Sequence, residues 1–197
     1  EKRNISYKRI EGEAAFYGPK IDIKMRDALG RGWQGPTIQF DFNLPKRFDL
    51  NYVGADGARH KVIMIHRTVM GSMERFVGGL IEHYAGAFPV WLAPEQARIM
   101  TITDDHIPYG REVESKLLAA GFRAEGDFRN EKIGYKIREA QRDKIPYMLI
   151  LGAREAETGE VSLRLREQGD LGSISLEELM QRMRSDIENK SLTAGAV

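Results

Sequence analysis

The feature that most constrains the fold is an alternation of apolar runs and amphipathic segments after residue 96. Three short apolar runs are typical of strands, and the two segments between them have the apolar spacing of helices. The strands are predicted at residues 97–103, 122–128 and 147–152, and the helices at residues 108–120 and 133–142. Strands joined by helices form right-handed crossovers, so this half is expected to build a mixed, mostly parallel α/β sheet covered on both faces.

Two further elements are expected to complete this half. Residues 160–166 (EVSLRLR) alternate polar and apolar side chains, which predicts an edge or near-edge strand. Residues 175–187 have helical spacing, with Ser175 as the N-cap and Glu178 at the distance of a capping box. The tail from Asn189 is expected to be frayed.

The first half has a different, α+β pattern. Residues 20–25 alternate with a period of two and predict a half-buried strand, which a turn at residues 27–32 joins to a return strand at residues 33–41. Residues 42–57 are rich in turn-forming residues and are expected to be a connecting loop. The predicted sheet of this half is therefore antiparallel.

A strand followed directly by a helix is predicted within residues 62–85. The apolar run VIMI at residues 62–65 is typical of an inner strand, and after Gly71 the apolar spacing changes to that of a helix reaching residue 86. Polar residues gather at the junction, where α/β sheets usually bind ligands. Gly78 and Gly79 are costly inside a helix, which indicates close packing against a neighbour.

The segment AGAFPVWLAPEQ at residues 85–96 indicates a packed linker between two domains. The first domain is predicted at residues 1–92 and the second at residues 93–197. No apolar run approaches the roughly 20 residues of a membrane span, so no membrane partner and a cytoplasmic location are expected. The chain has no cysteine, which excludes disulfides and thiolate metal sites. It begins at Glu1, which suggests a piece of a longer protein.

Basic side chains gather around the second predicted helix of the C-terminal half. Together with Tyr135 they suit RNA, where cations bind phosphates and aromatic rings stack on bases. They are Arg129, Lys132, Lys136, Arg138, Arg142, Lys144 and Arg154. A solvated helix face balanced by Glu131, Glu139 and Asp143 explains the same pattern. The net charge of +1 gives no bulk attraction to nucleic acid, and DNA is not an expected partner.

Six segments in one order resemble the C-terminal portion of bacterial threonyl-tRNA synthetases, which are class II enzymes. They are FYGPKIDIK, WQGPTIQFDFNLPKRFDLNYVG, IMIHRTVMGSMERF, WLAP, RNEKIGYKIREAQ and IPYML. GSMERF resembles the third class II signature motif, and the preceding IHR points to the threonine enzyme. The resemblance implies the end of an antiparallel catalytic domain followed by an anticodon-binding domain. It also implies threonine, ATP with Mg and threonine tRNA as ligands, and a homodimeric parent enzyme.

The resemblance also implies roles for particular residues. Arg75 corresponds to the motif arginine at the ATP phosphates, which its permanently charged planar group suits. The other positions implied around ATP are Gln34, Thr37, Ser72 and Glu74, and the catalytic positions on the amino-acid side are Gln39, Tyr17 and Lys20. From the residues alone, polar side chains on a strand are usually explained by exposure to solvent.

His66 corresponds to one of three zinc ligands in the family, where zinc holds the amino and hydroxyl groups of threonine and so excludes valine. Without the resemblance, a lone histidine at a strand end is more often structural. The other two ligands have no counterpart in this sequence, and neither have the first two class II motifs. We therefore expect weak zinc binding at most, and no activation of threonine by this chain on its own.

The C-terminal half resembles the anticodon-binding domain of this synthetase subgroup. The positions implied to contact the anticodon are Asn130, Lys132, Lys144, Glu155 and Arg164. Glu155 accepting from a base N–H and Arg164 donating to base oxygens agree with their hydrogen-bonding groups. Lys144 stands where some members have arginine, so its contact is the least secure. The alternative is an RNA-binding module without catalysis.

Overall fold

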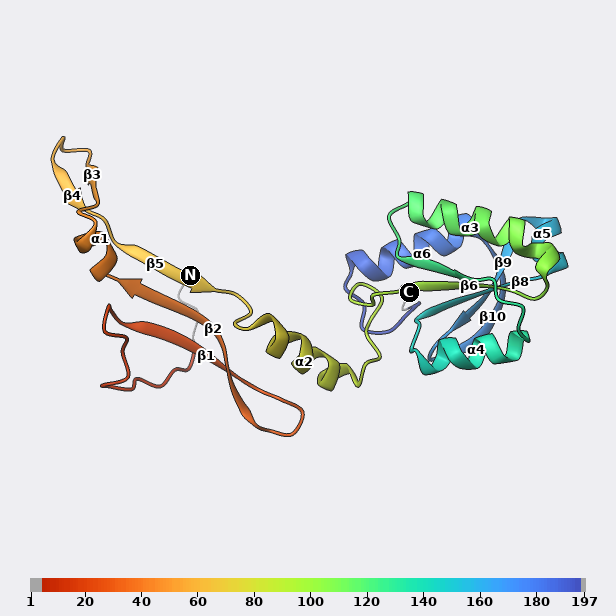
Figure 1. The fold of residues 1–197 in the computed structure, drawn as a ribbon, viewed down its shortest axis with the longest axis horizontal. Helices are drawn as coiled ribbons and strands as arrows, with labels where there is room; N and C mark the ends of the chain where they lie inside the picture. The colour runs from red at the N-terminus through yellow and green to blue at the C-terminus, as the bar shows by residue number, and fades with distance from the viewer. Residues whose placement is uncertain (1–4, 196–197) are drawn as a thin grey trace. The chain divides into compact units, whose positions relative to one another are not determined.

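The computed structural model describes residues 5–195, in two compact units of residues 1–83 and 84–197. The first unit holds a three-stranded antiparallel sheet in the order β1-β2-β5, a two-stranded hairpin of β3 and β4, and two helices (Figure 1). The strands are β1 (Lys20–Arg26), β2 (Gly32–Asp41), β3 (Asn51–Val53), β4 (Arg59–Lys61) and β5 (Met64–Thr68), and the helices are α1 (Asn43–Arg47) and α2 (Met73–Tyr84). The predicted antiparallel sheet is confirmed.

The loop expected at residues 42–57 is wrong in part, because α1 and β3 lie within it. Asp41 supplies the local cause of the helical turn. Its Oδ1 accepts hydrogen bonds from the backbone N–H groups of Asn43 and Leu44, at 2.8 and 3.0 Å. A carboxylate that satisfies the first N–H groups favours a helix start, here only one turn long.

The inner strand predicted at residues 62–65 is also wrong for the described part of the chain. β5 pairs only with β2, and the side chains of Ile63 and Ile65 are 59% and 57% exposed. No residue of α2 is buried, and apart from Pro45 the buried apolar side chains of residues 5–195 begin only after α2, at Pro89 and Val90. Apolar composition indicates which side chains favour burial, but burial also requires a neighbouring element.

The second unit is built on a five-stranded sheet in the order β10-β9-β8-β6-β7. Its elements are β6 (Ala97–Thr101), α3 (Ile107–Ala119), β7 (Ala124–Asp127), α4 (Ile133–Arg142), β8 (Tyr147–Leu151), α5 (Ala153–Thr158), β9 (Glu160–Leu165), β10 (Gly169–Ser175) and α6 (Leu176–Glu188), with a 3-10 turn at Asp104–His106. β6 is parallel to β7 and β8, whereas β8–β9 and β9–β10 are antiparallel. The predicted mixed sheet is confirmed. The outermost strand on its antiparallel side is β10, which was not predicted, so β9 is the strand next to the edge.

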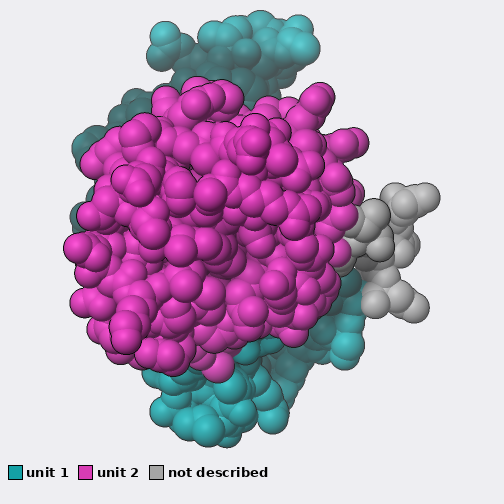
Figure 2. Space-filling view, turned by 90° about the vertical axis from the view of Figure 1, so that its right-hand side faces the viewer, with its two compact units in different colours: residues 1–83 teal, residues 84–197 magenta. Residues whose placement is uncertain are grey.

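Helices cover both faces of this sheet, as expected (Figure 1). On one face, Val113 and Leu117 of α3 and Leu179 and Met183 of α6 join the larger buried cluster, which includes Leu149. On the other face, a smaller cluster of Met100, Met148, Ala140 and Ile145 packs with apolar residues of α4. The face of this unit turned to the viewer in Figure 2 is rounded. Among the described helices, none is long and apolar enough to cross a membrane.

The frayed tail expected from Asn189 is wrong as far as Gly195. Ala194 is only 1% exposed, and the backbone N–H of Gly195 donates to Asp186 Oδ2 at 2.7 Å. The same oxygen accepts from the Tyr147 hydroxyl at 2.7 Å. A buried carboxylate must be paired, so this segment is held against the domain. Residues 196–197 of the tail lie outside the described range.

Candidate functional site

The three residues implied to line the amino-acid side of the catalytic site, Tyr17, Lys20 and Gln39, lie together in the first unit. The Tyr17 hydroxyl donates to Gln39 Oε1 at 2.7 Å, and Gln39 lies directly opposite His66 in the β2–β5 pairing. The rings of Tyr17 and His66 meet edge to face, with centroids 6.3 Å apart. Lys20 lies opposite Gln39 on the other side of β2. The β-sheet register therefore gathers these side chains from three separate sequence segments.

His66 is held by a buried carboxylate. Its Nε2 lies 2.9 Å from Asp41 Oδ2. Burial acts to raise the pKa of Asp41, but hydrogen bonds from His66 and from the backbone of Leu44 and Asn43 outweigh burial and hold that pKa below its usual range. A carboxylate behind a histidine is the usual outer partner of a metal ligand. Asp41 was missed by the sequence reasoning, although its place two residues before the first residue of α1 is a recognisable capping signal.

Zinc does not fit the described part of the chain by itself. Residues 5–195 contain no group of three or more His, Cys, Asp or Glu side chains that could hold a metal ion. A single imidazole leaves three positions of a tetrahedral ion unfilled. Asp41 orients His66 by a hydrogen bond, and residues 5–195 supply no other part of a zinc site.

The predicted nucleotide-side residues Gln34 and Thr37 meet at Asp22. Gln34 Nε2 donates to Asp22 Oδ1 at 3.1 Å and to Thr37 Oγ1 at 3.2 Å, and Thr37 Oγ1 lies 3.2 Å from the same carboxylate oxygen. Lys20 Nζ pairs with Asp22 Oδ2 at 2.9 Å, and this contact raises the pKa of Lys20. The alternation of β1 places Lys20 and Asp22 on one face, a signal that the sequence reasoning did not use for Asp22.

A pocket of about 440 Å³ lies beside these residues, and Gln34, Ser72 and Arg75 of the predicted site line it. The Arg75 guanidinium lies 5.7 Å from the centre of the Trp33 ring. The pocket thus offers a permanent cation beside an aromatic face, which suits an anionic ligand with a planar group. The sequence reasoning missed Trp33, although an aromatic residue next to Gln34 on the same strand is a visible candidate.

Ser72 and Glu74 are engaged with each other at the start of α2. Ser72 Oγ donates to Glu74 Oε2 at 2.6 Å, which lowers the pKa of Glu74. The backbone N–H of Arg75 lies 3.5 Å from Ser72 Oγ. Ser72 therefore holds the turn that presents Arg75, while Glu74 does not line the pocket.

In the second unit, Asn130 and Lys132 lie on the exposed loop between β7 and α4. A buried lysine one turn further along holds this loop. Lys136 is 2% exposed, and its Nζ donates to the carbonyl oxygens of Thr101 and Asp127 at 3.0 and 3.1 Å. Burial lowers the pKa of Lys136. Lys136 therefore ties together the ends of β6 and β7 and does not face solvent, contrary to its place in the predicted basic cluster.

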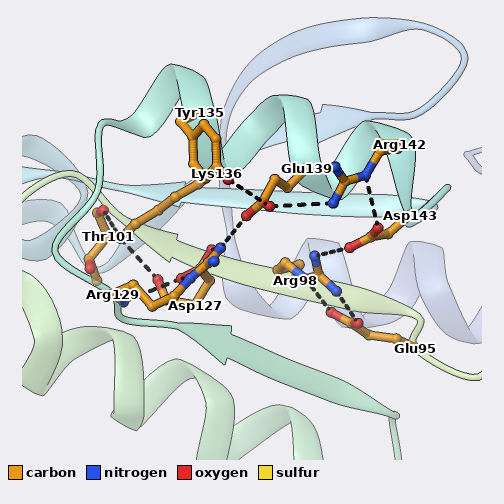
Figure 3. A network of polar contacts seen from close by, with 10 residues as sticks. All are labelled: Glu95, Arg98, Thr101, Asp127, Arg129, Tyr135, Lys136, Glu139, Arg142 and Asp143. Carbon is orange, nitrogen blue, oxygen red and sulfur yellow. Dashed lines mark hydrogen bonds and ion pairs between the residues drawn. The ribbon is translucent and has the colours of Figure 1, made fainter.

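Acidic partners neutralise much of that cluster (Figure 3). Arg129 pairs with Asp127 and Glu139, in each case with 2.6 Å between nitrogen and oxygen. Arg142 also reaches Glu139, at 3.3 Å. The solvated, charge-balanced alternative is thus correct for this flank of α4. Lys132, Arg138 and Arg154 have no acidic partner in the described structure.

The five predicted anticodon positions do not all lie at the same end of the strands. Three of them follow the carboxyl ends of the parallel strands: Asn130 and Lys132 come after β7, and Glu155 comes after β8. Lys144 precedes the amino end of β8, which is the opposite end of the sheet along the strand direction. Its ammonium donates to the carbonyl oxygen of Ala85. Glu155 Oε2 accepts from the backbone N–H of Gly152 at 3.0 Å, which caps α5 and fixes the carboxylate.

Arg164 has an unfilled hydrogen-bond donor. Its strand neighbours Leu163 and Leu165 belong to the cluster under α3 and α6, so alternation places Arg164 on the other face, beside its cross-strand partner Met148 and near α4. Its Nε is buried and has no hydrogen-bond partner among the described residues. Buried donors in native proteins are rarely left unpaired, so an unpaired one calls for an explanation such as a ligand.

Two family models match the chain, one for each half. The model described as "tRNA synthetase class II core domain (G, H, P, S and T)" matches residues 2–84, and the model described as "Anticodon binding domain" matches residues 96–186. The chain is 57% identical over 185 residues to a threonine–tRNA ligase of Clostridium botulinum, covering 94% of this chain and 29% of that protein. It is 55% identical over 192 residues to the threonine–tRNA ligase of Desulforamulus reducens, covering 98% of this chain and 30% of that protein.

Solved structures agree with these matches. The chain is similar to the crystal structure of the RNA-binding domain of threonyl-tRNA synthetase from Cryptosporidium parvum, with a TM-score of 0.81 and 38% identity over 93% of this chain and 45% of that one. It is also similar to a putative threonyl-tRNA synthetase from Aeropyrum pernix, with a TM-score of 0.64 and 29% identity over 94% of this chain and 45% of that one. The chain spans less than a third of the length of the curated relatives above.

Proposed function

Because the chain belongs to the threonyl-tRNA synthetase family and matches the C-terminal portion of its members, we propose that it serves a threonine–tRNA ligase by reading the tRNA anticodon and supplying the third class II motif. The parent reaction would activate threonine with ATP and Mg and transfer it to threonine tRNA. The parent would act in the cytoplasm as a homodimer. The domain boundary would lie in the linker near residue 92, between the two matched regions.

Anticodon reading is supported most directly by Arg164. Its side chain has no hydrogen-bond or ion-pair partner among the described residues, so the terminal N–H groups, beyond the buried Nε, can donate to the oxygen and nitrogen acceptors of a base edge. Glu155, fixed by its hydrogen bond to Gly152, would accept from a base N–H through its other oxygen. Asn130 and Lys132 would contact the phosphates and bases of the loop. Lys144 is the weakest member, since its ammonium is engaged at Ala85.

The first test compares binding of the chain to threonine tRNA and to the same tRNA with a substituted anticodon, at one stated salt concentration. A base-specific contact is worth about 1–3 kcal/mol, so Arg164→Ala should remove about 5-fold to about 150-fold of the preference between the two tRNAs. Arg184→Ala, which removes an exposed cation from α6 on the opposite face, should leave the preference unchanged. An equal loss of affinity for both tRNAs in Arg164→Ala would contradict base reading.

In the first unit, Arg75 would lie against the ATP phosphates, in the pocket that it forms with Trp33 and Gln34. Thr37, Ser72 and Glu74 would hold the surrounding turn and strand in place. Tyr17, Gln39 and Lys20 would line the amino-acid side, and His66, held by Asp41, would be one ligand of a metal whose other ligands are not found in residues 5–195. We therefore propose no stable zinc site in this chain.

The second test is pyrophosphate exchange with threonine and ATP. We expect no turnover by this chain alone, because the motifs that complete the family's adenylation site have no counterpart in its sequence. Clear exchange above a control carrying Arg75→Ala would refute this. Tight one-to-one retention of zinc after chelation would refute the absence of a stable zinc site.

One observation favours the second candidate, an RNA-binding module without catalysis. Within residues 5–83 Pro45 is the one buried apolar side chain and the others remain at least partly exposed, so the first unit has little core of its own. The same binding measurement separates the candidates. A general RNA-binding module would bind both tRNAs equally, whereas the anticodon-reading portion of a ligase would prefer threonine tRNA.

A further inference from the structure

Helix α4 presents an aromatic ring and a guanidinium group side by side at the surface. Tyr135 is 40% exposed. Arg138 follows three residues later, and its guanidinium carbon lies 5.9 Å from the centre of the Tyr135 ring. Residues three apart are neighbours on a helix surface, so the helix itself sets this pair. No acidic side chain pairs with Arg138 in residues 5–195.

The Tyr135 ring is fixed before any ligand binds. Its hydroxyl donates to Glu139 Oε1 at 3.0 Å (Figure 3). The other oxygen of Glu139 accepts from Arg129 at 2.6 Å, and Arg129 is held in turn by Asp127. A ring that is already oriented loses little conformational freedom on binding, so stacking on it retains more of its favourable energy.

The pair adjoins the loop that carries two proposed anticodon contacts. The backbone N–H of Tyr135 donates to the carbonyl oxygen of Lys132 at 2.8 Å, so Tyr135 lies one turn beyond Lys132 and near Asn130. Glu131 lies on the same stretch of chain without a cation partner among the described residues and would repel a phosphate, whereas Glu139 is neutralised by Arg129 and Arg142. A ring beside carboxylates is therefore better suited to the uncharged face of a base than to the RNA backbone.

From these contacts we propose that Tyr135 and Arg138 form a stacking platform for one unpaired base of the anticodon loop. This inference rests on the proposed function and extends it to a base other than those that Glu155 and Arg164 would read by hydrogen bonds. Every base has a π-face, so stacking contributes affinity with little dependence on base identity. The platform would strengthen the complex without choosing the anticodon.

The test uses RNA stem–loops of the threonine anticodon arm, with 2-aminopurine placed in turn at each unpaired loop position. Stacking changes the fluorescence of this base, so binding of the chain should alter the signal strongly at one position. Tyr135→Ala should abolish that change and weaken binding by about 5-fold to about 150-fold, the range for one stacked base. Tyr135→Phe keeps the ring and should keep the fluorescence change.

The result that would overturn the platform is an unchanged affinity and fluorescence response in Tyr135→Ala while Lys132→Ala still weakens binding. In that case the proposed function would stand. If the unaltered chain shows no preference for the threonine anticodon, the proposed function itself fails. Arg138→Leu removes the cation without touching the Tyr135 hydroxyl, so it tests the platform independently and should also reduce affinity and the fluorescence change. No response to Arg138→Leu would count against the role of the guanidinium.

Discussion

Two lysines one turn apart, one just before α4 and one within it, have opposite environments. Lys132 is exposed before the helix, while Lys136 is buried and donates to two carbonyl oxygens. Lys136→Met should destabilise the chain by about 1–3 kcal/mol, because buried acceptors would lose their partner. Lys132→Met should leave stability within about 0.5 kcal/mol and weaken tRNA binding. Urea unfolding and tRNA titration of both variants check this, and equal unfolding midpoints would contradict the role of Lys136.

The carboxylates around Arg129 make the second unit sensitive to acid. Hydrogen bonds from Arg129 lower the pKa of Asp127 and of Glu139 below their ordinary values of 3.8 and 4.5. The unfolded chain therefore binds protons first as the pH falls, so this contribution to stability is full above about pH 4.5 and is lost as the pH falls through the lowered pKa values. Arg129→Gln should flatten the acid side of the stability curve measured by urea unfolding. An unchanged acid slope in that variant would contradict the assignment.

At the scale of single residues, sequence reasoning identified side chains but not their partners. The resemblance implied amino-acid-side positions for Tyr17 and Gln39 and a zinc ligand in His66. The three side chains lie together through the pairing of β2 with β5, which the sequence alone did not locate. Arg129 and Lys136 were both grouped as surface cations, yet one is paired with two carboxylates and the other is buried. Helical spacing gives the face of a residue, whereas its partner comes from another element, which a single sequence does not locate.

At the scale of elements, the two central glycines of α2 were expected to pack closely against a neighbour. A Cβ at Gly78 or Gly79 would meet no atom within 4 Å, so the expected close packing is wrong for the described residues. Gly78→Ala and Gly79→Ala should each stabilise α2 by about 0.5–1 kcal/mol, because alanine loses less backbone freedom in a helix. Slower amide exchange in α2 would show this.

Gly121→Ala is the matched control for these helix substitutions. Gly121 also has nothing within 4 Å of a Cβ, but its φ of +86° is left-handed. The same substitution there should destabilise the second unit by about 1 kcal/mol. Faster amide exchange of α2 in Gly78→Ala would instead reveal a neighbour packed on that face.

The elements that sequence patterns missed are short or lack an apolar signal. α5 has six residues and β10 begins with Gly-Asp-Leu-Gly, so neither has a clear period. The longer elements α3, α4 and α6 and the buried strands β6 and β8 were predicted, because their apolar residues follow the period of the element over several turns or a full strand. β5 was predicted as a strand, but its place at one end of the sheet depends on pairing, which its own residues do not encode.

At the scale of the whole molecule, the two units differ in what holds them together. The second unit contains two buried apolar clusters, one on each face of its sheet. The first unit is held by sheet hydrogen bonds and polar contacts, and in residues 5–83 its apolar side chains other than Pro45 are at least partly exposed. Burial of apolar surface is the main favourable term in folding, so the first unit should open locally at a much lower free energy than the second.

Amide hydrogen exchange with and without threonine tRNA tests the central claim, that the second unit has its own core and reads the anticodon while the first unit has little core of its own. We expect slow exchange in β6 and β8, fast exchange in β1, β2 and β5, and new protection by tRNA at residues 128–139 and 160–166. Threonine tRNA with a substituted anticodon should give much less of that protection. Slow exchange throughout the first unit, or tRNA protection that does not depend on the anticodon, would contradict the claim.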